Sequence, residues 1–404
     1  MAVGQCDFPQ MQPIPGISLG TACAGIKQHI KDDLLVIAMD AQASCAAVFT
    51  QNAFCAAPVL VAKANLTHAP RWLLINSGNA NAGTGAQGMQ DALKTCTDLA
   101  EIVGGNANQV LPFSTGVIGQ SLPVDKIKVA LPTAINALSS VNWDKAARAI
   151  MTTDTFPKGV SKIIWLDGHA ITINGISKGA GMIQPNMATM LAFIATDAKI
   201  NANLLQKCLA GAVEQSFNRI TVDGDTSTND ACVLMASGMS EAPEIQADSA
   251  QYQLFADAVM QVCKQLAEWI IRDGEGATKL MRIVVTEAFN SAEAVLVGKT
   301  IAHSPLVKTA FFASDPNWGR ILAAVGRAGV ESMILEEVQI DLDEVCIVSK
   351  GGRDSAYTEA AGQRVMNREE ITVTVKLGRG NAVEEILTCD FSYDYVKINA
   401  EYRT

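Results

Sequence analysis

Lys178-Gly-Ala-Gly-Met-Ile-Gln-Pro-Asn-Met-Ala-Thr-Met-Leu191 interrupts an otherwise regular alternation of strands and helices. Its three small residues after Lys178 and its Pro185 disfavour a continuous helix. Residues 190–196, by contrast, form the apolar run of a buried strand. Before the segment, residues 163–166 and 171–176 are β-rich and flank a turn, which predicts a strand pair. The segment is therefore expected to form a bend between two strands.

The rest of the chain also alternates between predicted strands and predicted helices. Short apolar runs predict buried strands, and spacings of three and four predict amphipathic helices, one of which closes at Gly104-Gly105. The expected strands are at 34–39, 46–50, 72–75, 232–235 and 371–375. The expected helices are one at about 87–103, two between 124 and 151, one near 203–217 and one at about 250–271. Asp273-Gly-Glu-Gly276 is the candidate boundary. It predicts a first domain of residues 1–280, which carries the segment 178–191, and a C-terminal domain of residues 281–404.

Composition favours a protein that acts on small molecules. The 404 residues are 49% apolar and 18% charged, enough to bury a large core. With 31 basic and 41 acidic side chains the net charge is −10, which argues against nucleic acid or an anionic membrane as the main partner. No run has the length of a membrane span, and the first residues lack the features of a secretion signal. A cytoplasmic location is the expectation.

The ten cysteines are scattered without a C-x-x-C pair. This spacing predicts neither a zinc site nor a disulfide framework. Most of them are expected to be small buried side chains in a reducing compartment.

Gly83-Thr-Gly-Ala-Gln-Gly88 has the G-x-G-x-x-G pattern of a dinucleotide-binding motif but not the surrounding features that the motif requires. The preceding strand is expected to end by Asn76, which puts the first glycine seven residues late. No acid stands about twenty residues beyond the last glycine, where a ribose would need one. NAD binding is therefore not expected.

Gly175-Ile-Ser-Lys-Gly179 has the G-x-S-x-G spacing of a serine-hydrolase nucleophile. In such enzymes a helix begins directly after the nucleophilic serine, whereas glycines and Pro185 follow Ser177 here. Only His303 lies downstream as a triad partner. The serine-hydrolase interpretation stays open but disfavoured.

The polar loop Asp223-Gly-Asp-Thr-Ser-Thr-Asn-Asp230 begins like a calcium loop. Position six is Thr228 rather than glycine, and position twelve is Leu234 rather than glutamate, so the calcium site fails. Its carboxylates and hydroxyls are expected to cap neighbouring backbone groups.

The segment 178–191 resembles the self-cleavage motif of the glutamate N-acetyltransferase family, the ornithine acetyltransferases of arginine biosynthesis. Further stretches resemble that family in order, from residue 76 to the last residue: Asn76-Ser-Gly-Asn-Ala-Asn81, Ser114-Thr-Gly-Val-Ile-Gly119, Thr152-Thr-Asp-Thr155, Asp223 to Asp230, Asp273-Gly-Glu-Gly-Ala-Thr-Lys279, Asp315-Pro-Asn-Trp-Gly-Arg320 and Ile398-Asn-Ala-Glu-Tyr-Arg-Thr404. Gln184 is a small departure from the motif.

The resemblance implies that the chain cuts itself between Ala188 and Thr189, giving an α chain of residues 1–188 and a β chain from 189. Thr189 would then carry both the nucleophilic hydroxyl and a free amine to activate it. The implied reaction moves an acetyl group from N2-acetylornithine to glutamate. The implied fold is mixed α+β: a layered αββα-type domain with a smaller C-terminal α/β domain, related to the β-aminopeptidase fold. Two α and two β chains would form a heterotetramer.

The resemblance also implies the roles of individual residues. The oxyanion pair falls on Thr115 and Gly116. The substrate-binding residues fall on Thr153, Lys178, Thr189, Glu275, Asn399 and Thr404. Lys178 suits a carboxylate and Glu275 an ammonium, although the sequence does not assign which group meets which. No metal and no cofactor is implied, and acetyl-CoA stays open as a co-substrate.

Two alternatives remain at this stage. An N-terminal-nucleophile amidase or aminopeptidase would make the same cut at Thr189 but pass the acyl group to water. A small-molecule-binding regulator without catalysis is disfavoured by the intact Thr189, Thr115 and Gly116, and would consist of one uncut chain.

Overall fold

The computed structural model describes residues 3–4, 7–27, 30–184 and 190–401. Its strands form three sheets. The four-stranded sheet has the order β1 (Ile17–Ala22), β2 (Leu34–Met39), β4 (Trp72–Asn79) and β5 (Val110–Val117). The five-stranded sheet has the order β3 (Ser44–Phe49), β10 (Ala231–Ala236), β8 (Leu191–Thr196), β7 (His169–Lys178) and β6 (Lys158–Leu166).

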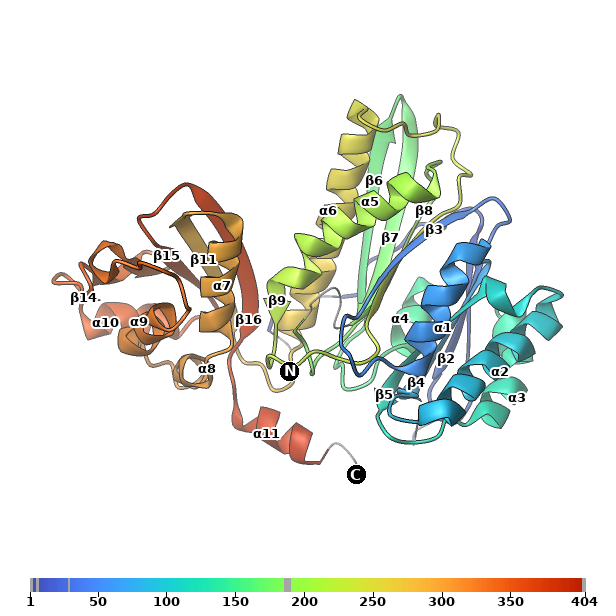
Figure 1. Ribbon diagram of the computed structural model, residues 1–404, viewed down its shortest axis with the longest axis horizontal. Coiled ribbons are helices and arrows are strands. Elements are labelled where there is room, and N and C mark those ends of the chain that lie inside the picture. The colour runs from blue at the N-terminus through green and yellow to red at the C-terminus, as the bar shows by residue number, and fades with distance from the viewer. Residues whose placement is uncertain (1–2, 5–6, 28–29, 185–189, 402–404) are drawn as a thin grey trace.

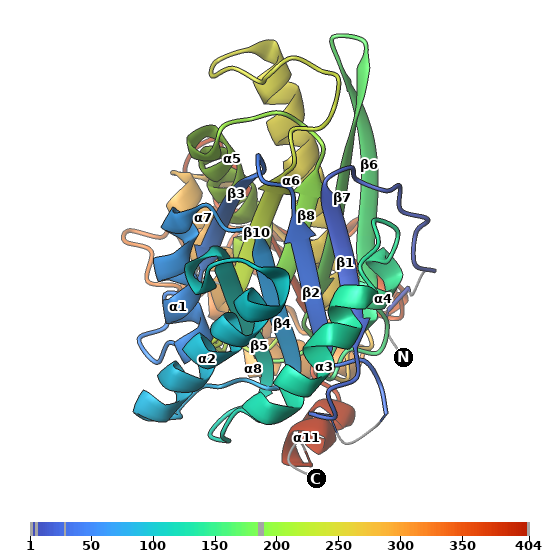
Figure 2. The ribbon, with the colours of Figure 1, turned by 90° about the vertical axis from the view of Figure 1, so that its right-hand side faces the viewer.

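These two sheets pack face to face between two layers of helices (Figures 1 and 2). In β2, Leu35 and Ile37 enter the core between the sheets, whereas Leu34 and Val36 face the helices. This alternation is the period of two that a strand imposes. Helices α1 (Ala57–Asn65), α2 (Gly85–Val103) and α3 (Val124–Asn136) cover the four-stranded sheet, α5 (Ala202–Glu214) and α6 (Ala250–Arg272) cover the other, and α4 (Trp143–Ala149) packs beside β1. The predicted layered αββα architecture is confirmed.

The third sheet has seven strands and its own core of residues from Met281 to Ile386. Its order is β14 (Gly352–Arg353), β13 (Val345–Ser349), β12 (Gln339–Leu342), β15 (Glu370–Lys376), β11 (Leu280–Ala288), β16 (Ala382–Cys389) and β9 (Ile220–Thr221). Helices α7 (Ser291–Ala302), α8 (Pro305–Phe312), α9 (Trp318–Gly326) and α10 (Glu359–Met366) accompany it, and α11 (Tyr393–Ala400) follows. Because β9 comes from before residue 280, the sheet alone does not fix the boundary, and the division into 1–280 and 281–404 stays a prediction.

The expected strand at 72–75 is longer in the structure. It continues to Asn79 because Gly78 still pairs with Gly116 of β5. The expectation that this strand ends by Asn76 was therefore wrong, and Gly83 follows the strand by four residues rather than seven. The other objection to a dinucleotide site, the missing acid, is unaffected by this correction.

The strand pair around residue 167 is also longer than predicted, with β6 and β7 in register from Leu166 opposite His169 to Lys158 opposite Ser177. The nine described cysteines are free, and five of them are buried. No helix in the described ranges is long and apolar enough to cross a membrane. Within the same ranges, no group of three or more histidine, cysteine or acidic side chains could hold a metal ion.

Candidate active site

A cavity of about 270 Å³ opens where β5 and β7 end and α11 returns to the first two sheets. It brings together all the predicted site residues that the structure describes, from five separate stretches of the chain: Thr115, Gly116, Thr153, Lys178, Glu275 and Asn399. The cleavage residues Ala188 and Thr189, and also Thr404, lie outside the described residues.

Thr115 and Gly116 lie near the end of β5, which runs parallel to β4. Gly116 has a φ of +135°, a region that favours glycine. A Cβ at this position would lie 2.3 Å from the carbonyl carbon of Gly78. Only glycine therefore lets the two strands approach this closely, and the backbone here forms one wall of the cavity.

Asn229 holds this wall in place through buried hydrogen bonds. Its Nδ2 donates to the carbonyl oxygens of Ala80 at 2.6 Å and Ser114 at 3.0 Å, and its Oδ1 accepts from the Thr228 hydroxyl at 2.6 Å. The amide is buried, so these bonds define its orientation. Sequence analysis placed Asn229 in a capping loop and missed this position beside the cavity. A buried asparagine that joins two strand ends leaves no local spacing pattern by which to find it.

Lys178 ends β7 and brings its ammonium to the cavity. Burial lowers the pKa of Lys178, and Lys158 acts in the same direction, while Asp154, Asp230 and Glu275 oppose this change. Across the described ranges, no carboxylate forms an ion pair with Lys178. A buried cation without a partner provides a site for an anionic group of a ligand.

Glu275 supplies the opposite charge. Its Oε2 accepts from Asn399 Nδ2 at 2.9 Å, and its backbone N–H donates to the Ala180 carbonyl at 2.9 Å. A Cβ at Gly181 would lie 2.4 Å from the Glu275 carboxyl carbon, so glycine is needed there for the carboxylate to occupy this place. Sequence analysis treated Gly181 only as one of the small residues that disfavour a continuous helix.

The polar loop after β9 caps backbone groups, as predicted. Asp223 accepts from the N–H groups of Met182 at 2.6 Å and Ile183 at 2.9 Å. Burial raises the pKa of Asp223, although its hydrogen bonds work against this shift. The loop thereby fixes the chain that leads from Lys178 toward residue 185.

The serine-hydrolase interpretation finds no support in the described geometry. Ser177 is buried inside β7, and its Oγ has no hydrogen-bond partner in the described ranges. His303 lies at the end of α7, and its Nε2 has no partner in the same ranges. Burial lowers the pKa of His303 to about 4. Among the described residues, Ser177 and His303 therefore form no catalytic pair.

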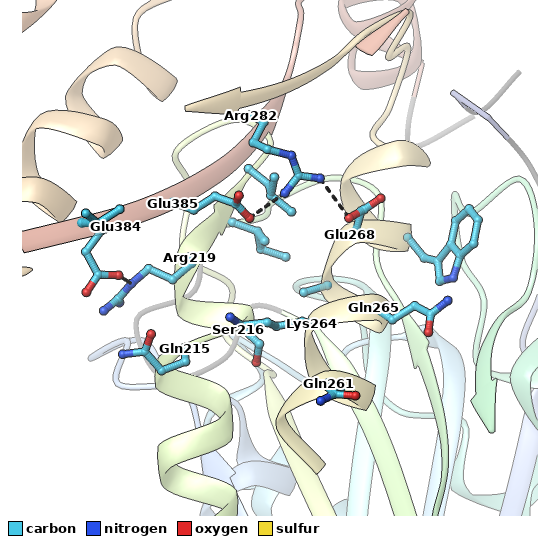
Figure 3. A pocket seen from close by; sticks show the side chains of 15 residues that line it. Gln215, Ser216, Arg219, Gln261, Lys264, Gln265, Glu268, Arg282, Glu384 and Glu385 are labelled. Carbon is cyan, nitrogen blue, oxygen red and sulfur yellow. Dashed lines mark hydrogen bonds and ion pairs between the residues drawn. The ribbon is translucent and has the colours of Figure 1, made fainter. Parts of the chain in front are cut away.

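A cavity of about 560 Å³ lies between α6 and β16, away from these residues. Its two arginines are already paired with glutamates. Arg282 lies 3.2 Å from Glu268 and 2.6 Å from Glu385, and Figure 3 draws both pairs. Arg219 lies 3.0 Å from Glu384. The lining holds three basic and three acidic side chains, so it carries no net charge for a ligand, and the smaller cavity, which gathers the predicted residues, is the better candidate site.

Comparisons with known proteins identify the family of this chain. The model of the ArgJ family matches residues 18–404. The arginine biosynthesis bifunctional protein ArgJ of Methylococcus capsulatus is 64% identical over 392 residues, covering 97% of this chain and 96% of that protein. The protein of the same name from Pseudomonas fluorescens is 54% identical over 407 residues and covers 100% of both chains. A crystal structure of the Bacillus halodurans protein is 40% identical, covers 50% of this chain and 95% of that chain, and has a TM-score of 0.49. Because the family model matches nearly the whole chain and full-length relatives exceed half identity, the chain belongs to the ArgJ family.

Proposed function

We propose that this chain is a glutamate N-acetyltransferase of arginine biosynthesis. It moves the acetyl group of N2-acetylornithine to glutamate through an acetyl-Thr189 intermediate, after cutting itself between Ala188 and Thr189. The names of its full-length relatives and the motif order along the chain support the proposal. The observation that carries it is the single cavity in which Thr115, Gly116, Lys178 and Glu275 meet.

The chemistry proceeds in two halves. In the first, the Thr189 hydroxyl attacks the acetyl carbonyl while the Thr189 amine takes its proton. Thr115 and the N–H of Gly116 stabilise the oxyanion, the carbon–nitrogen bond breaks, and ornithine leaves with the proton on its amine. In the second half, the amine of glutamate attacks the acetyl ester, and the Thr189 hydroxyl regains its proton.

The charges of the cavity suit an amino-acid substrate. Both substrates carry a carboxylate, which the unpaired Lys178 would hold, and ornithine carries an ammonium, which Glu275 would hold. Thr153 and Asn399 line the same cavity and complete the proposed binding set with Thr189 and Thr404. No metal or cofactor has a role in this scheme.

Assembly and location extend the proposal. We expect two α and two β chains in a heterotetramer, as the resemblance implies. We place the protein in the cytoplasm, because its nine described cysteines are unpaired. Sedimentation of the cut protein tests the assembly.

Acceptor dependence tests the reaction. We expect acetylornithine to be consumed only when glutamate is present, with N-acetylglutamate formed in equal amount. Consumption without glutamate, with release of acetate, would mean that water is the acceptor and that the chain is an amidase. A parallel assay with acetyl-CoA and glutamate alone decides whether acetyl-CoA is a second donor.

Glu275→Gln is expected to lower kcat/KM for acetylornithine by about 10- to 100-fold, because a charge-assisted hydrogen bond contributes about 1.5 to 3 kcal/mol. Glutamine still offers an oxygen to Asn399, so the hydrogen bond at 2.9 Å can persist. Steady-state kinetics with purified, cut protein measure the effect. Glu241→Gln is the control, since its side chain is 92% exposed. Equal kinetics of the two variants would remove Glu275 from the binding set.

A further inference from the structure

Three charged side chains form a buried cluster behind the cavity: Asp154, Lys158 and Asp273, called the charge cluster below. Lys158 begins β6 and is 1% exposed. Its Nζ lies 2.6 Å from Asp154 Oδ1 and 2.6 Å from Asp273 Oδ2, and both carboxylates are fully buried. The ring of Phe156 covers the ammonium at 5.0 Å. Because an unpaired charge is costly in such a place, the three side chains keep one another in fixed positions.

Both carboxylates also accept hydrogen bonds from backbone that leads to the cavity. Asp154 accepts from the N–H groups of Gly179 at 2.7 Å and Thr152 at 2.9 Å. Asp273 accepts from the N–H of Thr155 at 3.0 Å and from the Thr155 hydroxyl. One ammonium thereby connects three segments that are far apart in the sequence.

Each of these segments carries a residue that lines the cavity. Thr153 lies between two residues bonded to the charge cluster, Lys178 precedes Gly179, and Glu275 follows Asp273 by two residues. Lys158 itself does not line the cavity. It can therefore act on a ligand only through the backbone that its two carboxylate partners hold.

We propose that Lys158 is a positioning residue for substrate binding: through Asp154 and Asp273 it sets the spacing of Thr153, Lys178 and Glu275. The inference rests on the proposed function, because it assigns a substrate to that cavity. It goes beyond that function in making a side chain outside the cavity responsible for the binding geometry.

Electrostatics explain why a neutral residue would not replace Lys158. Burial favours the neutral form of Asp154, but Lys158 and Lys178 outweigh it and hold the pKa of Asp154 below its ordinary value. Burial raises the pKa of Asp273, and its proximity to Asp154 adds to this effect. Without the ammonium, two buried carboxyl groups would face each other, and repulsion or proton uptake would change their separation.

Lys158→Met tests the inference, with Lys308→Met as the matched control. Lys308 is also 1% exposed and bonds Thr388 Oγ1 at 2.9 Å and the Cys389 carbonyl, but it lies in α8 and does not line the cavity. We expect both variants to melt at lower temperature. Only Lys158→Met should lower kcat/KM for acetylornithine and for glutamate, by about 10- to 100-fold and mainly through KM, as a displaced binding group does.

Calorimetric titration of each cut variant with ornithine provides a readout independent of turnover. Weaker binding by Lys158→Met than by Lys308→Met would support the inference. If Lys158→Met does not fold, Asp273→Asn replaces it, because the amide oxygen still accepts from Thr155 while the charge opposite Lys158 is lost; a rise in KM of about tenfold is expected.

Unchanged KM and ornithine affinity, with only a lower melting temperature, would overturn the inference and leave the charge cluster a purely structural role. A Lys158→Met chain that stays uncut would also overturn the inference, because Lys158 would then be needed for self-cleavage rather than for substrate binding. A cut wild-type protein that binds ornithine but transfers no acetyl group would refute the proposed function alone.

Discussion

Thr189→Ala should leave a single uncut chain of 404 residues without acetyl-transfer activity, whereas the wild-type protein should give two bands on a denaturing gel. A cut between Ala188 and Thr189 yields fragments of 188 and 216 residues, about 20 and 23 kDa in proportion to length. The variant lacks the hydroxyl needed for the shift of the acyl group from nitrogen to oxygen. It also lacks the nucleophile of the transfer reaction, so both functions fail together.

N-terminal sequencing of the larger wild-type fragment should read Thr-Met-Leu-Ala-Phe. Thr189→Ser is the matched control, because it keeps a hydroxyl and, once cut, an adjacent amine; it should be cut and retain measurable transfer. A wild-type protein that is active while uncut would refute both the cleavage and the role of the Thr189 amine as base.

The individual strands and helices could be predicted because their signals are local, whereas the layered arrangement was expected only from the resemblance to the family. Short continuous apolar runs mark strands such as β2 and β10, and the helical period marks α2 and α6, whatever the rest of the chain does. The end of β4 could not be placed in this way. Its last residues pair with β5 through Gly78 and Gly116, and a pairing between glycines leaves no apolar pattern.

The cavity could be predicted only as a set of residues, not as an arrangement. Resemblance to the family supplied Glu275 and Asn399, but the hydrogen bond between them joins residues 124 positions apart in the sequence. The need for glycine at position 181 arises from a carboxylate that approaches from another segment. Lys158 was not predicted as a functional residue. Its two partners come from a loop and from the end of α6, and the sequence distances from Lys158 to these partners match no known motif. These three features arise from contacts between segments that are distant in the sequence, and local residue propensities do not encode such contacts.

Thr115→Ala should lower acetyl transfer by about 100- to 1,000-fold, as the loss of one oxyanion donor does in acyl-transfer enzymes. In the proposed mechanism its hydroxyl and the N–H of Gly116 stabilise the negative charge that develops on the acetyl oxygen. The structure adds a reason for the expected size of the effect. Thr115 is only 9% exposed, and Asn229 holds the neighbouring Ser114 carbonyl at 3.0 Å, so the wall is too rigid for another donor to move in.

Ser114→Ala separates catalysis from stability for this wall. The Ser114 hydroxyl donates to Asn76 Oδ1 at 2.6 Å, inside the protein, so its removal should cost about 1 to 3 kcal/mol of unfolding free energy.

Thr115→Ala should show the reverse: a melting temperature near that of the wild type and a large loss in the rate of ornithine release in the first turnover. Because the β5 backbone pairing does not use the Thr115 side chain, the fold has little reason to change. First-turnover release at the wild-type rate would place the oxyanion at other donors, and Gly116 would lose its assigned role together with Thr115.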